Sequence, residues 1–213
     1  MALDADRAKA QVQGAMNVHE PQGTEERILS SRTAFRGELL RVQVDEVEVR
    51  AGRHATREMV VHRGAVVVVA IHERKVVMER QYRHAAKKAL WELPAGTLEE
   101  GEAPEECAKR ELLEETGFKA SAVEELSHFY VAPGYSTEMI HLFYTEDVSP
   151  SIQSQEHDED IEVHLVPIES AIGMVHANEI EDAKTIIGIL LLKARLERKD
   201  PGKNNTAGAK DGR

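Results

Sequence analysis

Seven consecutive apolar residues at positions 65–71, Ala-Val-Val-Val-Val-Ala-Ile, constrain the fold of this chain more than any other segment. Branched side chains such as valine favour extended backbone. A strand without polar alternation is typical of a sheet that is covered on both faces. The run therefore predicts a layered fold in which a central sheet is packed between other elements.

The flanking segments predict strands first and then helices. Residues 28–61 alternate apolar and polar positions (Val42, Val44 and Val47 among them), with Gly37 and Gly52 as breaks, which predicts a small antiparallel sheet. Further strands are expected at 75–83, 90–94, 122–131, 140–144 and 161–166, and helices at 104–116, 169–176 and 183–198. We expect an α+β fold, an α/β/α sandwich with a mixed sheet between helices, preceded by the N-terminal antiparallel sheet.

Composition divides the 213 residues into four parts. Residues 1–25 and 199–213 are polar and without period, so we expect a disordered arm and a disordered tail. Between them we expect a lobe at 26–60, formed by the N-terminal sheet, and one main domain at 61–198.

Charge and cysteine content narrow the function classes. A net charge of −11 argues against binding to nucleic acid or anionic membranes. The single cysteine, Cys107, excludes an intramolecular disulfide. No apolar run approaches the length of a membrane span, and residues 1–6 do not resemble a signal peptide. We therefore expect a soluble cytoplasmic protein.

The helix expected at 104–116 has a costly charge pattern. Pro104 suits its first position, and Gly117 suits its end. Glu111, Glu114 and Glu115 crowd one face of the last turns, where like charges repel and the helix dipole disfavours acids. A divalent cation against that face would explain the pattern, because carboxylates are ligands for Mg²⁺. A solvated acidic face in an acid-rich chain is the alternative.

The spacing around this helix carries a family resemblance. Nine residues stand in one fixed frame, and they are Gly96, Glu102, Arg110, Glu111, Leu112, Glu114, Glu115, Gly117 and Phe118. Such a match arises by chance with a probability on the order of one in ten million. The segment 96–118 resembles the Nudix box in every specified position, and weaker features extend the resemblance over residues 28–195.

The resemblance implies a site for two or more Mg²⁺ ions, with Mn²⁺ as a possible substitute. By position in the box, Glu111 and Glu115 would be the principal ligands, Glu114 a further or supporting one, and the carbonyl of Ala95 another. Arg110 would pair with a carboxylate and orient it, and Glu102 would brace the loop.

Features outside the box resemble the ADP-ribose pyrophosphatase branch of the family. They are the segment 91–95 (Trp-Glu-Leu-Pro-Ala), Pro133 sixteen residues after Gly117, and Glu138, which we assign to substrate binding. A Pro-Gly turn is the ordinary interpretation of residues 133–134. Arg83 resembles the arginine that contacts the diphosphate, although it also suits a surface charge at a strand end. The branch further implies a homodimer with an exchanged N-terminal sheet, in which Phe35 or Arg36 contacts the base.

The catalytic base in this branch comes from an acidic loop rather than from the box. Here the corresponding loop is residues 155–160. Glu159 is the preferred base and an additional metal ligand, Glu156 the fallback, and Glu114 a further catalytic candidate. His157 stands where the branch often has a second acid. A solvated loop without a role is the alternative.

Together the resemblance implies Mg²⁺-dependent hydrolysis of the diphosphate bond of ADP-ribose to AMP and ribose 5-phosphate. Another sugar nucleotide such as GDP-mannose, a dinucleoside polyphosphate or an oxidised nucleotide remains open as the substrate. A non-catalytic ADP-ribose sensor is the alternative of another class. A zinc hydrolase is disfavoured because the ten histidines show no zinc-ligand spacing.

Overall fold

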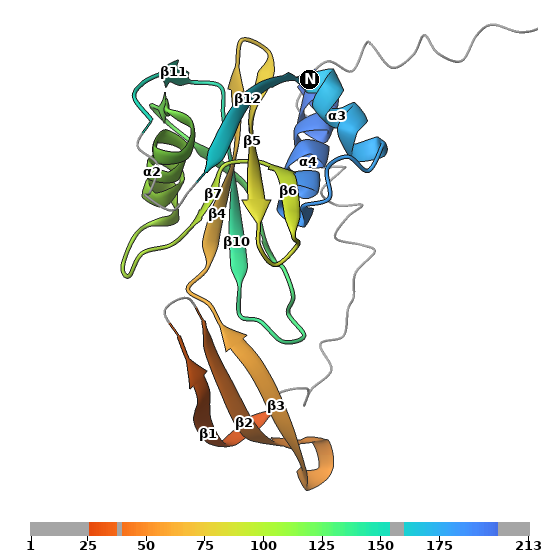
Figure 1. Cartoon of the computed structure of the whole chain (residues 1–213). Coiled ribbons are helices and arrows are strands. Elements are labelled where there is room, and N and C mark those ends of the chain that lie inside the picture. The colour runs from red at the N-terminus through yellow and green to blue at the C-terminus, as the bar shows by residue number, and fades with distance from the viewer. Residues whose placement is uncertain (1–25, 38–39, 154–159, 200–213) are drawn as a thin grey trace, which may run out of the picture.

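The structure is a computed structural model that describes residues 26–37, 40–153 and 160–199. Figure 1 shows a three-stranded sheet at one end of the molecule and a larger sheet with helices on both faces at the other. The first sheet contains β1 (Arg27–Arg36), β2 (Arg41–Val49) and β3 (Arg53–Val61), all antiparallel, and a short 3₁₀ turn (Arg50–Gly52) joins the last two. Among the described helices, none is long and apolar enough to cross a membrane.

The larger sheet is mixed. Its main path runs β12-β5-β4-β10-β9, and β10 pairs with β4 in parallel while the other pairs are antiparallel. The strands are β4 (Ala65–His72), β5 (Lys75–Arg83), β9 (Glu124–Tyr130), β10 (Met139–Thr145) and β12 (Ile161–Pro167). The valine run lies on β4 between β5 and β10, which explains why residues 66–70 are completely buried.

The two central strands separate soon after their connecting turn. β4 and β5 pair directly only at Ile71–Val76 and His72–Lys75. Beyond that point β5 pairs with β6 (Lys88–Glu92) and β4 pairs with β7 (Ala95–Thr97). The segment 88–97 thus occupies the space between the diverging strands, and it leads directly into the box.

Two separate apolar cores lie on the two faces of this sheet. Helix α2 (Pro104–Thr116) covers one face, where Cys107, Ala108 and Leu112 pack against Val66 and Val68. Helices α3 (Ile168–His176) and α4 (Ala183–Lys199) cover the other face (Figure 1), where Ile189 and Leu192 join a larger cluster with Val67 and Val69. Alternate valines of β4 therefore serve opposite cores. The short strands β8 (Phe118–Ala120) and β11 (Val148–Pro150) pair beside α2.

The predicted fold class is confirmed: a mixed sheet lies between helices, and a small antiparallel sheet precedes it. The predicted helix at 104–116 has the predicted ends, because Pro104 is at its start and Gly117 adopts a left-handed conformation at its C-cap. The sequence did not predict β7, β8 and β11, which have three residues each and are too short to show a period. The four-part division of the chain stays a prediction. Its arm and residues 200–213 of its tail lie outside the described residues, and Lys199 is the last residue of α4.

Close packing at Gly188 gives a stability prediction. A Cβ at this position would lie 2.5 Å from Cδ1 of Leu93 and 3.1 Å from Cγ2 of Val69, and both neighbours are completely buried. We expect Gly188→Ala to lower the free energy of unfolding by about 1–3 kcal/mol, because overpacking outweighs the gain in helix propensity. Urea denaturation measures this change in the free energy of unfolding. The matched control is Gly173→Ala on α3, where a Cβ meets open space. Equal stability of the two variants would contradict this account.

Candidate active site

The acidic face of α2 lies against the backbone of β7. A Cβ on Gly96 would overlap the carboxylate of Glu111, so only glycine allows the helix and the strand to approach this closely. Gly96 is not among the glycines with positive φ, whereas Gly117 is, with φ of 71°. The requirement at Gly96 is for space.

Glu115 contacts the neighbouring residue of the same strand. Its Oε2 accepts a hydrogen bond from the backbone N–H of Ala95 at 2.9 Å, and the residue is only 3% exposed. The side-chain amide of Gln153 donates to the backbone carbonyl of Glu115. The chain therefore runs past the end of α2 immediately before residues 154–159.

Arg110 joins the acids of the box into one network. Its Nε and Nη2 donate to the two oxygens of Glu102 at 2.8 and 3.0 Å. Its Nη1 lies 2.9 Å from both Glu111 Oε1 and Glu114 Oε2. The predicted pairing of Arg110 with a carboxylate is therefore confirmed. Hydrogen bonding from Arg110 lowers the pKa of Glu102 to about 2, so this carboxylate stays charged and holds the guanidinium in place.

The donors around β7 fit a hard divalent ion by their chemistry. They are all oxygen atoms: the carboxylates of Glu111, Glu114 and Glu115, and the carbonyl of Ala95. As placed, no three His, Cys, Asp or Glu side chains in the described part of the chain gather closely enough to hold a metal ion. Glu111 and Glu114 contact Arg110 instead, and Glu115 contacts the amide of Ala95. The space left free by Gly96 nevertheless lets Glu111 reach the strand beside Glu115.

Arg83 lies on the same side of the sheet as α2. Val77 and Arg83 are an even number of residues apart on β5, so their side chains share one face of the sheet. Val77 packs in the core beneath α2. Hydrogen bonds with Glu92 raise the pKa of Arg83, and the charge of Glu115 contributes in the same direction. The nearness of Arg83 to the box acids supports its assignment, although the structure also gives it a partner that the sequence did not reveal.

That partner is Glu92, which is 2% exposed. Both of its oxygens accept hydrogen bonds from Arg83, at 2.7 and 2.9 Å, and Lys184 of α4 donates to one of them. Burial would raise the pKa of Glu92, but the hydrogen bonds and charges of Arg83 and Lys184 outweigh burial and lower it. Sequence reasoning missed Glu92 and Lys184 because no local spacing connects positions 92 residues apart.

The other predicted site residues lie apart from this cluster or outside the description. Glu138 precedes β10, and its backbone N–H bonds to the hydroxyl of Ser136 at 3.1 Å. Phe35 and Arg36 lie at the end of β1, where Arg36 is in register with Arg41. Glu156 and Glu159, the candidate bases, lie outside the described residues. Their roles stay predictions.

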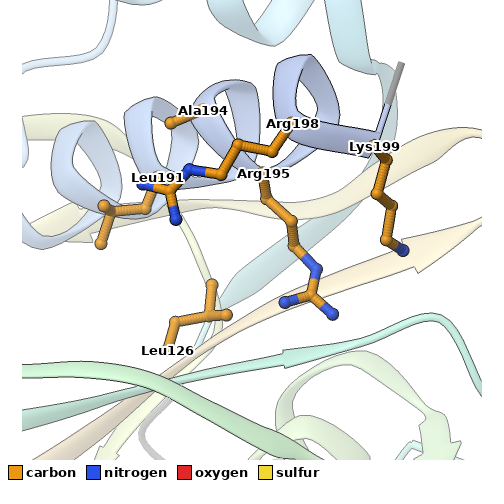
Figure 2. A pocket seen from close by; sticks show the side chains of 6 residues that line it. All are labelled: Leu126, Leu191, Ala194, Arg195, Arg198 and Lys199. Carbon is orange, nitrogen blue, oxygen red and sulfur yellow. The ribbon is translucent and has the colours of Figure 1, made fainter. Parts of the chain in front are cut away.

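A cavity of about 330 Å³ lies elsewhere, between β9 and α4 (Figure 2). It is lined by Leu126, Leu191, Ala194, Arg195, Arg198 and Lys199, none of which belongs to the box or its surroundings. Leu126 and Leu191 pack with the core beneath α3 and α4, so the cavity is on the opposite face of the sheet from α2. Arg195 in its wall is already paired with Glu124 and stacked on Tyr144. The geometry thus favours the box as the active site.

The close approach at Gly96 predicts the effect of one methyl group. Gly96→Ala would force the carboxylate of Glu111 away from β7, and we expect it to weaken binding of Mn²⁺ by about tenfold. Titration of the purified protein with Mn²⁺, followed by electron paramagnetic resonance, measures the free ion. Gly134→Ala is the control, since a Cβ there meets nothing within 4 Å. Unchanged affinity in Gly96→Ala would exclude Glu111 as a ligand held by this contact.

Comparison with known proteins agrees with this geometry. An ADP-ribose pyrophosphatase of Bacillus subtilis is 38% identical over 80% of this chain and 94% of its own length. A methanol dehydrogenase activator of Bacillus methanolicus is 39% identical over 79% and 93%. An ADP-ribose pyrophosphatase of Mycobacterium tuberculosis is 35% identical over 78% and 82%.

A solved structure shows the same fold. The crystal structure of an ADP compounds hydrolase superposes with a TM-score of 0.74 at 22% identity, covering 82% of this chain and 96% of that one. The family model of the NUDIX domain matches residues 61–187. This range includes the whole box, strands β4 to β12 and the start of α4. The chain therefore belongs to the Nudix hydrolase family.

Proposed function

We propose that this protein hydrolyses the diphosphate bond of ADP-ribose, giving AMP and ribose 5-phosphate, with Mg²⁺ as the physiological ion and Mn²⁺ as a substitute. The observation that carries diphosphate hydrolysis is the approach of Glu111 and Glu115 to consecutive residues of β7, on the face of the sheet that also holds Arg83. The choice of ADP-ribose rests on the two relatives that bear this activity in their names.

Nudix hydrolases generally use divalent metal ions. Here Glu111, Glu115 and the carbonyl of Ala95 would hold them, with Glu114 in support. When bound, such ions neutralise a diphosphate and lower the pKa of a coordinated water.

In this proposal Arg83, Arg110 and a carboxylate base have separate roles. Arg83, whose side chain is 41% exposed, would bind a diphosphate oxygen through Nη1, because Nε and Nη2 already donate to Glu92. Arg110 keeps Glu102, Glu111 and Glu114 at fixed positions and reduces their mutual repulsion. A carboxylate would accept the proton of the attacking water, and Glu159 is our first choice.

The flanks of residues 154–159 support this choice. On one side Gln153 contacts the carbonyl of Glu115. On the other side Ile161 is in register with Gln81 on β5, two residues before Arg83. The described chain therefore ends at Gln153 beside the end of α2 and resumes before β12, the strand that pairs with the one holding Arg83.

Product analysis with ADP-ribose and Mg²⁺ tests the proposal. We expect AMP and ribose 5-phosphate from the native chain and a loss of rate of about a hundredfold in Glu115→Gln. Glu100→Gln is the control, because Glu100 is an exposed acid in the loop between β7 and α2. A similar loss in Glu159→Gln but not in Glu156→Gln would assign the base. Faster turnover of GDP-mannose would disprove the substrate, and binding of ADP-ribose without turnover of either compound would favour the sensor.

The proposal includes a homodimer that exchanges the N-terminal sheets, in a cytoplasmic setting. All ten residues of β1 are exposed in the single chain, and they include Ile28, Leu29 and Phe35 at 60%, 39% and 56%. Exposed large apolar side chains on an edge strand favour a partner that covers them. Phe35 and Arg36 lie at the end of this sheet that is nearest to β4, and from there they could contact a base bound by the other subunit.

Light scattering after size exclusion tests the dimer. We expect about twice the chain mass of 23.7 kDa. Ile28→Glu should shift the protein toward the single-chain mass, because a buried charge without a partner opposes association. Ile152→Glu is the control, since Ile152 is 87% exposed and outside the sheet. A native protein with the single-chain mass at every concentration would overturn the proposal.

A further inference from the structure

The start of helix α4 forms a polar network that the family comparison does not explain. Asp182 precedes the helix, and its Oδ2 accepts hydrogen bonds from the backbone N–H and the hydroxyl of Thr185, at 2.9 and 2.6 Å. This is the arrangement of an N-cap, and it fixes the direction of the Thr185 hydroxyl. Lys184 lies 3.0 Å from the same Asp182 oxygen. Lys184 and Thr185 each also contact a residue of the segment 88–97, which fills the gap between β4 and β5.

Thr185 holds the backbone that leads to the box. Its hydroxyl oxygen accepts a hydrogen bond from the backbone N–H of Leu93 at 2.9 Å, and both residues are completely buried. The next residue, Pro94, has a fixed φ, and its carbonyl accepts a hydrogen bond from the N–H of Val68 at 2.9 Å. The residue after that is Ala95, whose N–H donates to Glu115. Thr185 therefore holds the chain at Leu93, two residues before Ala95, and Val68 of β4 and Glu115 of α2 hold the peptide between Pro94 and Ala95 itself.

Lys184 contacts the pair formed by Glu92 and Arg83. It donates to Glu92, the buried carboxylate that also accepts both hydrogen bonds of Arg83. Its side chain is 15% exposed and that of Glu92 is 2% exposed, so the contact is largely shielded from water. Arg83 and Lys184 thus share Glu92, while Asp182 lies beside Lys184. Lys184 therefore compensates part of the charge of Glu92, and Arg83 is left freer to bind an anionic ligand. Without Lys184, Glu92 and Arg83 would form a self-contained neutral pair.

We propose that the first turn of α4 is a positioning element of the active site. Thr185 fixes the backbone at Leu93, two residues before Ala95, and Lys184 adjusts the Glu92–Arg83 pair that faces the substrate. The inference about Lys184 rests on the proposed function, and that about Thr185 rests only on binding of a divalent ion. Neither residue would touch substrate. Both act through the strand segment on which the ligands lie.

Metal binding without substrate tests Thr185. We expect Thr185→Val, which keeps the shape and removes the hydroxyl, to weaken Mn²⁺ binding by about tenfold, whereas Thr185→Ser stays within about twofold of the native protein. The matched control is Thr145→Val. Thr145 is also buried, and its hydroxyl accepts the N–H of Asp147 at 3.1 Å, away from the box. The control should lose thermal stability comparably and bind Mn²⁺ normally.

Steady-state kinetics test Lys184. With ADP-ribose we expect Lys184→Met to raise KM by about tenfold with kcat nearly unchanged, because such a split marks lost binding of substrate rather than lost chemistry. Lys184→Arg should restore most of the native KM. Lys193→Met on the same helix is the control, and its lysine has no ion pair among the described residues.

The outcomes separate this inference from the proposed function. If the native protein does not hydrolyse ADP-ribose, the proposed substrate is wrong, and the Mn²⁺ titrations still decide the role of Thr185. If Thr185→Val does not fold, Asp182→Asn replaces it, since the amide weakens the bond that orients the hydroxyl. Native Mn²⁺ affinity in whichever of these two variants is titrated would overturn the role of Thr185. An unchanged KM in Lys184→Met, or equal changes in Lys193→Met, would overturn that of Lys184.

Discussion

The close contact between α2 and β7 is the constraint on which the rest of the site depends. Gly96 has no side chain, so the carboxylate of Glu111 can occupy the space where a Cβ would otherwise be. The same approach places Glu115 within a hydrogen bond of the Ala95 amide. Three acids near the negative end of a helix oppose folding through their repulsion. Arg110 offsets part of this cost from within the helix, since it contacts Glu102, Glu111 and Glu114 together.

The divergence of β4 and β5 makes room for the strand that α2 contacts. Because the two strands pair only near their turn, the chain between them can return twice, first as β6 and then as β7. One short segment then carries Glu92, Leu93 and Ala95, which contact Arg83, Thr185 and Glu115 respectively. Residues from β5, α2 and α4 therefore meet on a segment of a few residues. A small shift of this segment would therefore move both Glu115 and Arg83.

Much of the site could be predicted from the sequence because its signals are local. The box residues lie on one helix and its two flanking loops, so their spacing alone brings the acids to one face. The resemblance to the Nudix box, which rests on the same local spacing, implies the pairing of Arg110 with a carboxylate. The partners of Arg83 could not be predicted in this way. Glu92 is nine residues away on a neighbouring strand, and Lys184 lies far along the chain on a helix. Neither position has a composition or period that distinguishes it from ordinary surface charge.

By itself, the sequence determined the layered fold, the bounds of the helices, the position of the acidic helix and the family of the protein, because apolar periodicity, capping residues and box spacing are short-range properties of the chain. Only the tertiary structure decided three further features. It paired β10 with β4 in parallel, it required Gly96 for space rather than for its backbone angles, and it brought the start of α4 to the strand beside the box. These features share one physical reason: each depends on contacts between side chains and backbone that come together only when the sheet and both helical layers pack.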